Sequence, residues 1–181
     1  RRLKRADEFL LEAETALQCP IDIIAGREEA RLIYLGVTQW VSGHRQKQLV
    51  MDIGGGSTEL IIGKDYEPLQ MESLQFGCVS VTNRFFANGK VTEKNLKKAR
   101  QKVAAELQEI QTTFRNAGWK AAIGSSGTIR SAAAMCEANG WSRKGITAEA
   151  LKQLEKKALS FKNTSEIQID GLSERRQPVF I

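Results

Sequence analysis

The chain has 181 residues, of which 41% are hydrophobic and 27% charged, and its formal net charge is +6 at pH 7. This composition is typical of one or two globular domains, and no apolar run approaches the roughly 18 residues of a membrane-spanning helix. We therefore expect a cytoplasmic protein with no integral membrane segment. The single histidine, His44, excludes a histidine-rich metal cluster, and the positive charge, concentrated after residue 60, favours a polyanionic partner.

The first part of the chain predicts two helices with a strand between them. Leucine and alanine recur at intervals of three and four over residues 3–17, which is typical of an amphipathic helix. The stretch CPIDIIAG, residues 19–26, alternates β-branched side chains and predicts a short buried strand. A second helix is predicted over residues 27–41. Its buried face is expected to hold Ala30, Ile33, Val37 and either Trp40 or Val41.

A hairpin forms the centre of the predicted fold. The runs QLVMDI and TELIIG, residues 48–53 and 58–63, are typical of strands, and the turn between them is made almost wholly of glycine. A third strand is predicted over residues 68–76. The stretch VTNRFFA, residues 81–87, predicts a short helix.

One more strand is predicted between two helices. Thr92 is a good N-cap for a long helix over residues 93–117, which carries a continuous apolar stripe. The stretch WKAAIG, residues 119–124, predicts a strand. After the turn SSG, a further helix is expected over residues 128–138.

The end of the chain predicts another helix and an unfinished one. Thr147 opens a helix through about residue 161, and the closing stretch LSERRQPVFI is typical of a helix start capped by Ser173. Because the chain also opens on Arg1 rather than Met, we expect it to be a piece of a longer protein. The order of elements predicts an α/β fold, with a sheet built from a hairpin and connected by long helices.

The turn in LVMDIGGGSTELIIG is the most informative feature of the sequence. Glycine allows close approach of a ligand to the backbone, and consecutive N–H groups form a nest for phosphate. Asp52 before the turn and Glu59 after it would repel phosphate unless a cation intervenes, so we predict Mg²⁺ held by these two carboxylates. The alternative is an ordinary glycine hairpin with solvated ends. The predicted phosphate-binding residues of the turn are Gly54, Gly55 and Gly56.

A second glycine stretch, AAIGSSGTIRSAA, lies between a predicted strand and a predicted helix. Helix-end N–H groups at such a junction point toward an anion. The candidate phosphate-binding residues here are Gly124, Gly127 and Thr128. The alternative is that these glycines only form a turn.

The stretch AGREEARL places Glu28 and Glu29 in the first turn of a predicted helix. Carboxylates are favoured there by the positive end of the helix dipole, which is one sufficient explanation. The other is catalytic, since a glutamate at a helix start, close to a phosphate nest and a metal ion, can activate water as a general base.

Five stretches together resemble a known family: CPIDIIAGREEARLIYLGV, DIGGGSTELIIG, GCVSVTNRFF, GSSGTIRSAA and GLSERR. In this order they are similar to the exopolyphosphatase and guanosine pentaphosphate phosphatase family, over essentially the whole chain. The wider sugar kinase, actin and heat-shock ATPase superfamily shares the glycine hairpin. The resemblance implies a ribonuclease-H-like (actin-like ATPase) lobe with a mixed sheet and long flanking helices. It also implies that residues 1–42 end a first lobe and carry the base, and that residues 43–181 form a second lobe, truncated at its C-terminus.

The resemblance assigns roles to the candidate residues. Glu29 corresponds to the water-activating base, and Asp52 and Glu59 to acidic positions linked to Mg²⁺. The phosphate loop corresponds to Gly54, Gly55, Gly56 and Ser57. The implied reaction is attack of water on a terminal phosphoryl group with release of orthophosphate. The family's other phosphate loop, in the first lobe, has no counterpart after Arg1, so the isolated chain is expected to be inactive.

Two substrates are open within this family, inorganic polyphosphate and guanosine pentaphosphate. The stretch GWKAAIGSSGTIRSAA is more similar to the exopolyphosphatases, and the basic later part of the chain suits a long polyanion, so we expect polyphosphate. Nucleic acid is not expected as a partner, and the full-length protein is expected to form a homodimer. A third possibility is a lobe that binds nucleotide or polyphosphate as a sensor without hydrolysing it.

Overall fold

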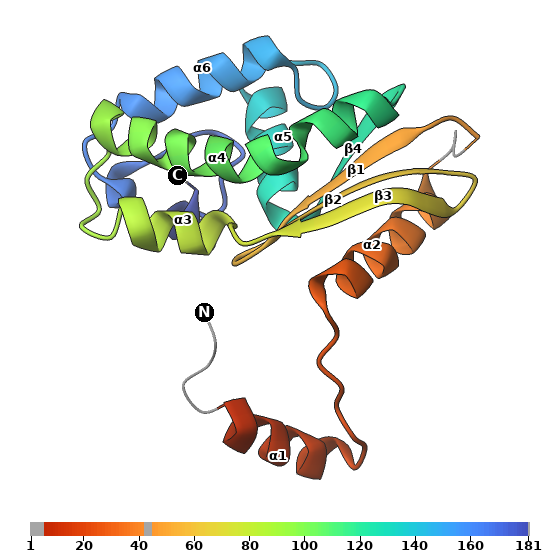
Figure 1. The fold of residues 1–181 in the computed structure, drawn as a ribbon. Coiled ribbons are helices and arrows are strands. Elements are labelled where there is room, and N and C mark those ends of the chain that lie inside the picture. The colour runs from red at the N-terminus through yellow and green to blue at the C-terminus, as the bar shows by residue number, and fades with distance from the viewer. Residues whose placement is uncertain (1–5, 42–44, 181) are drawn as a thin grey trace.

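The structure is a computed structural model that describes residues 6–41 and 45–180 (Figure 1). The first residues of the predicted N-terminal helix, and His44 with part of its predicted loop, therefore lie outside the described residues. Its centre is a four-stranded sheet in the order β3-β2-β1-β4, in which β2 pairs antiparallel with both neighbours and β4 runs parallel to β1. The strands are β1 (Gln48–Ile53), β2 (Thr58–Lys64), β3 (Glu67–Leu74) and β4 (Ala121–Ser125).

Helices flank this sheet, which confirms the predicted α/β fold with a mixed sheet and long flanking helices. Hydrogen bonds from the backbone N–H of Asn95 to Thr92 and of Ala150 to Thr147 confirm the two predicted N-caps. The α-helices are α1 (Ala6–Leu17), α2 (Gly26–Trp40), α3 (Cys78–Phe85), α4 (Glu93–Ala117), α5 (Ser126–Ala138) and α6 (Ala148–Leu159). Two short 3₁₀ helices follow, η1 (Thr164–Glu166) and η2 (Gln177–Val179).

The two faces of the sheet are covered by different helices, because side chains alternate along each strand. On one face, Val50 and Ile61 pack against Ala30 and Tyr34 of α2. On the other face, an apolar cluster includes Phe114 of α4. Its buried members are Leu49, Leu60, Ile62, Leu74, Phe76 and Phe114.

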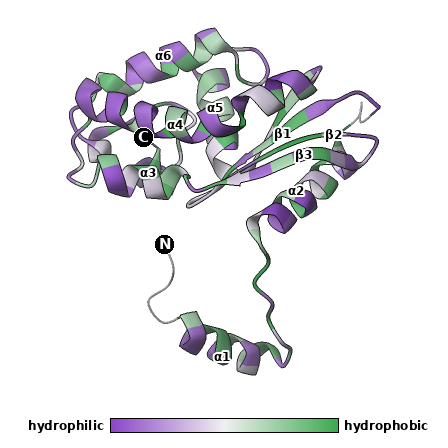
Figure 2. Cartoon of the chain, in the orientation of Figure 1, coloured by the Kyte–Doolittle hydropathy of each residue, from purple (hydrophilic) through white to green (hydrophobic). Residues whose placement is uncertain are grey.

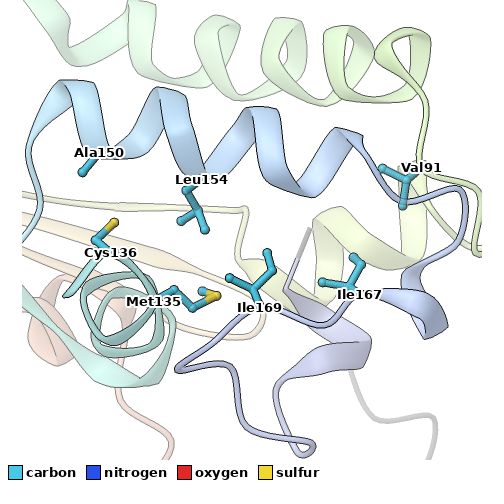
Figure 3. Packing of buried hydrophobic residues seen from close by; sticks show 7 residues of the cluster. All are labelled: Val91, Met135, Cys136, Ala150, Leu154, Ile167 and Ile169. Atoms are coloured by element: carbon cyan, nitrogen blue, oxygen red, sulfur yellow. The ribbon is translucent and has the colours of Figure 1, made fainter. Parts of the chain in front are cut away.

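A third cluster joins α5 and α6 to the C-terminal segment (Figure 3). Met135 and Cys136 of α5 pack against Leu154 of α6, and Ile167 and Ile169 close the cluster from the C-terminal side. The position of this segment beside α5 brings residues after 170 back to the start of that helix.

The strand predicted over residues 19–26 is absent, and this prediction was wrong. Residues 21–25 are neither helix nor strand, and Ile23 remains 75% exposed. Figure 2 shows this segment as a hydrophobic trace between α1 and α2, apart from the sheet. A strand needs a hydrogen-bonding partner, and none of the described strands pairs with this segment.

The predicted buried face of α2 is confirmed, because Ala30, Ile33 and Val37 pack in the cluster on the sheet. Of the two alternatives at the end of this face, Trp40 is 91% exposed and Val41 is half-buried. One further local prediction was wrong. The stretch predicted as a helix start at Ser173 instead forms a turn, in which Arg176 N–H donates to the Ser173 carbonyl, followed by η2.

The division of the chain at residues 42 and 43 stays a prediction. α1 buries no residue and lies apart from the sheet (Figure 1), whereas α2 packs directly on it. No helix within the described ranges is long and apolar enough to cross a lipid bilayer.

Candidate active site

A row of polar residues crosses all four strands on the face covered by α2. Asp52 of β1 lies opposite Glu59 of β2 and Ser125 of β4, and Glu59 lies opposite Ser73 of β3. Directly opposite residues in paired strands point to the same face, so the four side chains form one line at the end of the sheet next to the glycine turn. The next row on this face is apolar: Met71, Ile61, Val50 and Ile123.

Glu59 is the most unusual residue of this row, because its carboxylate is buried at 1% exposure. Its Oε1 accepts a hydrogen bond of 2.8 Å from the Ser73 hydroxyl. Burial raises the pKa of Glu59 above the ordinary value, although hydrogen bonds from Ser73 and Ser57 lower it, and the charges of Glu29 and Asp52 raise it further. The fold therefore gathers the three predicted carboxylates, Glu29, Asp52 and Glu59, at one place.

The start of α2 brings Glu29 to this row. A Cβ atom on Gly26 would lie 2.5 Å from the Ser73 hydroxyl oxygen, so only glycine allows α2 to begin so close to β3. The Glu29 N–H donates to the Ala25 carbonyl in the first turn of the helix, at 3.0 Å. Glu29 thus stands at a helix start that rests on the polar row.

The two glutamates of this first turn have different surroundings. Glu28 forms a two-pronged ion pair with Arg31 at 2.7 and 2.9 Å, and this hydrogen bonding lowers its pKa. Glu29 is exposed, and no residue that the structure describes forms an ion pair or hydrogen bond with its carboxylate. The Glu28 carboxylate is thus engaged by a cation of its own helix, whereas Glu29 is exposed to solvent.

The glycine turn, residues 54–57, is held from behind by α3. The Gly54 N–H donates to the Ser57 carbonyl at 3.0 Å and closes the hairpin. The N–H groups of Cys78 and Ser80 donate to the carbonyls of Gly54 and Gly55, at 2.9 and 3.0 Å. The carbonyls of Gly54 and Gly55 are thus bonded to α3. The N–H groups of Gly55, Gly56 and Ser57 have no acceptor among the described residues.

A left-handed backbone conformation, the usual reason for glycine in a tight turn, does not explain the three glycines here. None of the three glycines has a positive φ, and a Cβ atom on Gly56 would meet nothing within 4 Å. The steric demand falls on Gly77 instead, where a Cβ atom would lie 2.5 Å from the Gly54 carbonyl oxygen and 2.6 Å from Gly55. Packing within the chain thus explains Gly77, whereas Gly56 has no such explanation and leaves room for a ligand.

The second glycine stretch meets the same end of the sheet. The Ser126 hydroxyl donates to the Ile53 carbonyl at 2.8 Å, which ties the start of α5 to the end of β1. A Cβ atom on Gly124 of β4 would lie 2.2 Å from the Ile129 side chain of α5, so glycine lets the strand and the helix pack closely. At Gly127, a Cβ atom would overlap the Arg176 guanidinium, so this cation lies directly on the first turn of α5.

Thr128, which follows Gly127 in α5, lines a different pocket from the other candidates. Its Oγ1 is buried and has no hydrogen-bond partner among the described atoms. The residue lines a mostly apolar pocket of about 430 Å³ between α4, α5 and α6, which none of the other predicted site residues lines.

Three residues at the site were not predicted as functional. Ser73 and Gly26 have no sequence motif of their own, since their positions depend on strand register and on the packing of α2. Arg176 belongs to the stretch GLSERR, which contributed to the family resemblance but suggested no role for its arginines. Its basic side chain was the only feature of the sequence that could have suggested phosphate binding by Arg176.

The donor chemistry at the polar row fits Mg²⁺. Asp52 and Glu59 supply hard carboxylate oxygens from directly opposed positions, and two like charges so placed are unfavourable unless a cation lies between them. The described residues contain no group of three or more His, Cys, Asp or Glu side chains arranged to hold a metal ion. An ion bound here would therefore take most of its ligands from water and phosphate, as Mg²⁺ commonly does.

The four-stranded mixed sheet with helices on both faces is an actin-like domain of the kind seen in phosphatases of known structure. The chain belongs to the Ppx/GppA phosphatase family, whose sequence profile matches residues 1–181. It is 40% identical over 181 residues to a Haemophilus influenzae protein named provisionally as an exopolyphosphatase, covering 56% of that protein. It is 38% identical over 180 residues to guanosine-5'-triphosphate,3'-diphosphate pyrophosphatase of Aeromonas hydrophila, covering 36% of that protein.

Solved structures agree on the fold. The chain is similar to the Aquifex aeolicus PPX-GPPA enzyme with a TM-score of 0.76 at 25% identity, over 99% of this chain and 60% of that one. It is also similar in fold to an exopolyphosphatase from Cytophaga hutchinsonii, with a TM-score of 0.81 at 23% identity, over 98% of this chain and 59% of that one. The chain therefore spans little more than half the length of these proteins.

Proposed function

We propose that the protein containing this chain hydrolyses terminal phosphoryl groups of inorganic polyphosphate and releases orthophosphate. The observation that carries the proposal is the convergence of the exposed Glu29 carboxylate, the Asp52–Glu59 pair and the free N–H groups of the glycine turn at one end of the sheet. The name of the Haemophilus influenzae relative supports the same reaction.

In the proposed reaction, the N–H groups of Gly55 and Gly56 bind oxygens of the terminal phosphoryl group and orient it. Glu29 accepts a proton from the attacking water as the new oxygen–phosphorus bond forms. The bond from phosphorus to the bridging oxygen breaks, and that oxygen remains on the shortened polyphosphate as an anion. Orthophosphate leaves, and Glu29 returns its proton to solvent.

Mg²⁺ held near Asp52 and Glu59 would supply positive charge to the phosphoryl oxygens. The chain's own contribution is to fix the acidic pair. Ser73 orients the Glu59 carboxylate through its hydrogen bond, and β1 places Asp52 beside it. Arg176, which lies on the first turn of α5, is a further cation for the phosphate chain.

A second candidate substrate is guanosine pentaphosphate, which the name of the Aeromonas hydrophila relative favours. A third candidate role is a sensor that binds polyphosphate or nucleotide without hydrolysis. Glu29 argues against the sensor, because binding needs the glycine turn but no carboxylate that is free to take a proton. The homodimer and the cytoplasmic location expected from the resemblance stay predictions.

Phosphate release by the full-length protein tests the proposal. Glu29→Gln is expected to lower kcat by about 10²–10⁴-fold with little change in substrate affinity, since Gln keeps the shape but cannot take the proton. Glu28→Gln is the matched control and should retain kcat within a factor of a few, because Glu28 is bound to Arg31.

The outcomes separate the candidates. Faster release from guanosine pentaphosphate than from long polyphosphate would replace the proposed substrate by the second candidate. Binding without phosphate release from either compound would establish the sensor. Loss of activity in Glu28→Gln but not in Glu29→Gln would assign the base to the other glutamate.

A further inference from the structure

A second pocket lies on the other side of the glycine turn from the carboxylates. It has a volume of about 540 Å³ and is lined by Gly55, Gly56, Val79, Ser80, Asn83 and Arg84. Val81 of the same helix, α3, packs into the apolar cluster on the α4 side of the sheet, whereas Asp52 and Glu59 face α2. The glycine turn therefore separates an acidic side from a side that carries Arg84.

The Arg84 guanidinium is available to a ligand. It is exposed, and among the described residues no carboxylate forms an ion pair with it. Its charged carbon lies 5.4 Å from the centre of the Phe85 ring, a contact that favours one orientation of the guanidinium. Asn83, beside it, is exposed and adds an amide to the pocket wall.

Two backbone N–H groups at the start of α3 are not free to bind a ligand in this pocket. The N–H groups of Cys78 and Ser80 are already bonded to the carbonyls of Gly54 and Gly55. Among the residues that line the pocket, Arg84 is the one that carries positive charge. The pocket is lined by Gly55 and Gly56 as well as by Arg84, and its volume exceeds that of a single phosphoryl group, so the turn and Arg84 can contact different phosphoryl groups of one ligand.

We propose that Arg84 and Asn83 form a subsite for the inner phosphoryl groups of the substrate, next to the terminal group held by the glycine turn. This inference rests on the proposed hydrolysis of a phosphoanhydride. The acidic row on one side of the turn and the guanidinium on the other orient the polyanion, with its terminal group toward Glu29 and its remaining charge toward Arg84. Guanidinium groups bind phosphate oxygens through paired, charge-assisted hydrogen bonds.

Kinetics of the full-length protein with Arg84→Gln test the subsite. The KM for inorganic tripolyphosphate and for long polyphosphate is expected to rise about tenfold, the usual effect of losing a hydrogen bond to a charged group. Because Arg84 does not touch the terminal group, kcat should stay within a factor of about two, as should the inhibition constant of orthophosphate. Lys156→Gln removes the same charge from an exposed site on α6 and is the matched control.

A rise in KM for Arg84→Gln but not for Lys156→Gln, with orthophosphate inhibition unchanged, would establish the subsite. Equal effects of the two variants, or none, would overturn it. Calorimetric binding of tripolyphosphate to the wild type and to Arg84→Gln provides a test that does not depend on turnover. If the wild type binds tripolyphosphate more tightly than Arg84→Gln but releases no phosphate, the proposed hydrolysis is refuted and the subsite is retained. If the wild type and Arg84→Gln bind tripolyphosphate with equal affinity, the subsite alone is refuted.

Discussion

The Ser73 hydroxyl donates a 2.8 Å hydrogen bond to Oε1 of Glu59, and both residues lie on the sheet face covered by α2. This bond holds a buried carboxylate beside Asp52 and beneath the start of the helix that carries Glu29. The same serine defines the position of α2, because only glycine at residue 26 can approach it. One side chain thus connects the proposed base to the proposed metal-binding pair.

Glu59→Gln is expected to stabilise the protein at neutral pH when divalent cations are removed. Burial raises the pKa of Glu59 in the folded state above its unfolded value of 4.5. The protonated side chain therefore contributes fully to the free energy of unfolding below pH 4.5, and this contribution is lost as the pH rises through the folded-state pKa. Glutamine does not ionise, so the Glu59→Gln protein does not lose stability in this way. Its free energy of unfolding, measured with denaturant, should exceed that of the wild type at pH 7 and match it near pH 4. A wild type that is equally stable or more stable at pH 7 would contradict the cost assigned to the buried charge.

Asp52→Asn is expected to raise the Mg²⁺ concentration required for half-maximal phosphate release several-fold, because a neutral amide is a poorer ligand for a hard dication. Asp65→Asn is the control, since Asp65 lies in the β2–β3 turn and pairs only loosely with Lys64 at 3.6 Å. An unchanged Mg²⁺ titration for Asp52→Asn would remove this residue from the metal site.

Alanine at two glycines separates packing from ligand approach. Gly77→Ala places a Cβ atom against the backbone of Gly54 and Gly55, so it should destabilise the protein by about 1–3 kcal/mol and displace the turn. Gly56→Ala meets no protein atom and should leave thermal stability nearly unchanged. If the turn binds phosphate, Gly56→Ala should still raise KM. Normal kinetics for Gly56→Ala would favour an ordinary glycine hairpin.

Arg176→Gln is expected to raise the KM for polyphosphate, because it removes the cation that lies on the first turn of α5. The neighbouring Arg175→Gln removes an equal charge from an exposed position and should have little effect. Gly127→Ala should reproduce the Arg176 phenotype at small cost in stability, since its Cβ atom displaces only the flexible end of that arginine. Opposite behaviour of the two arginines would place the phosphate-binding cation at Arg175.

Much of the local structure follows from the sequence alone. The glycine turn between two apolar runs predicted the β1–β2 hairpin, and the register of that hairpin necessarily places Asp52 opposite Glu59. Thr92 and the apolar stripe behind it predicted α4 with its observed bounds, Glu93–Ala117. These features depend on neighbouring residues, through backbone conformation, capping and side-chain periodicity, and such information is present in a short window of sequence.

Only the tertiary structure decided the features that depend on distant partners. Ile23 and its neighbours have strand-like side chains, but a strand forms only where another strand offers its backbone. The burial of Glu59, the bond from Ser73 and the approach of Glu29 come from β3 and α2 packing on one face of the sheet. Gly127 meets Arg176 only because the C-terminal segment returns to α5. Local pattern determined which groups the chain carries, and long-range packing, which has no signature in a single stretch of sequence, determined which of them meet.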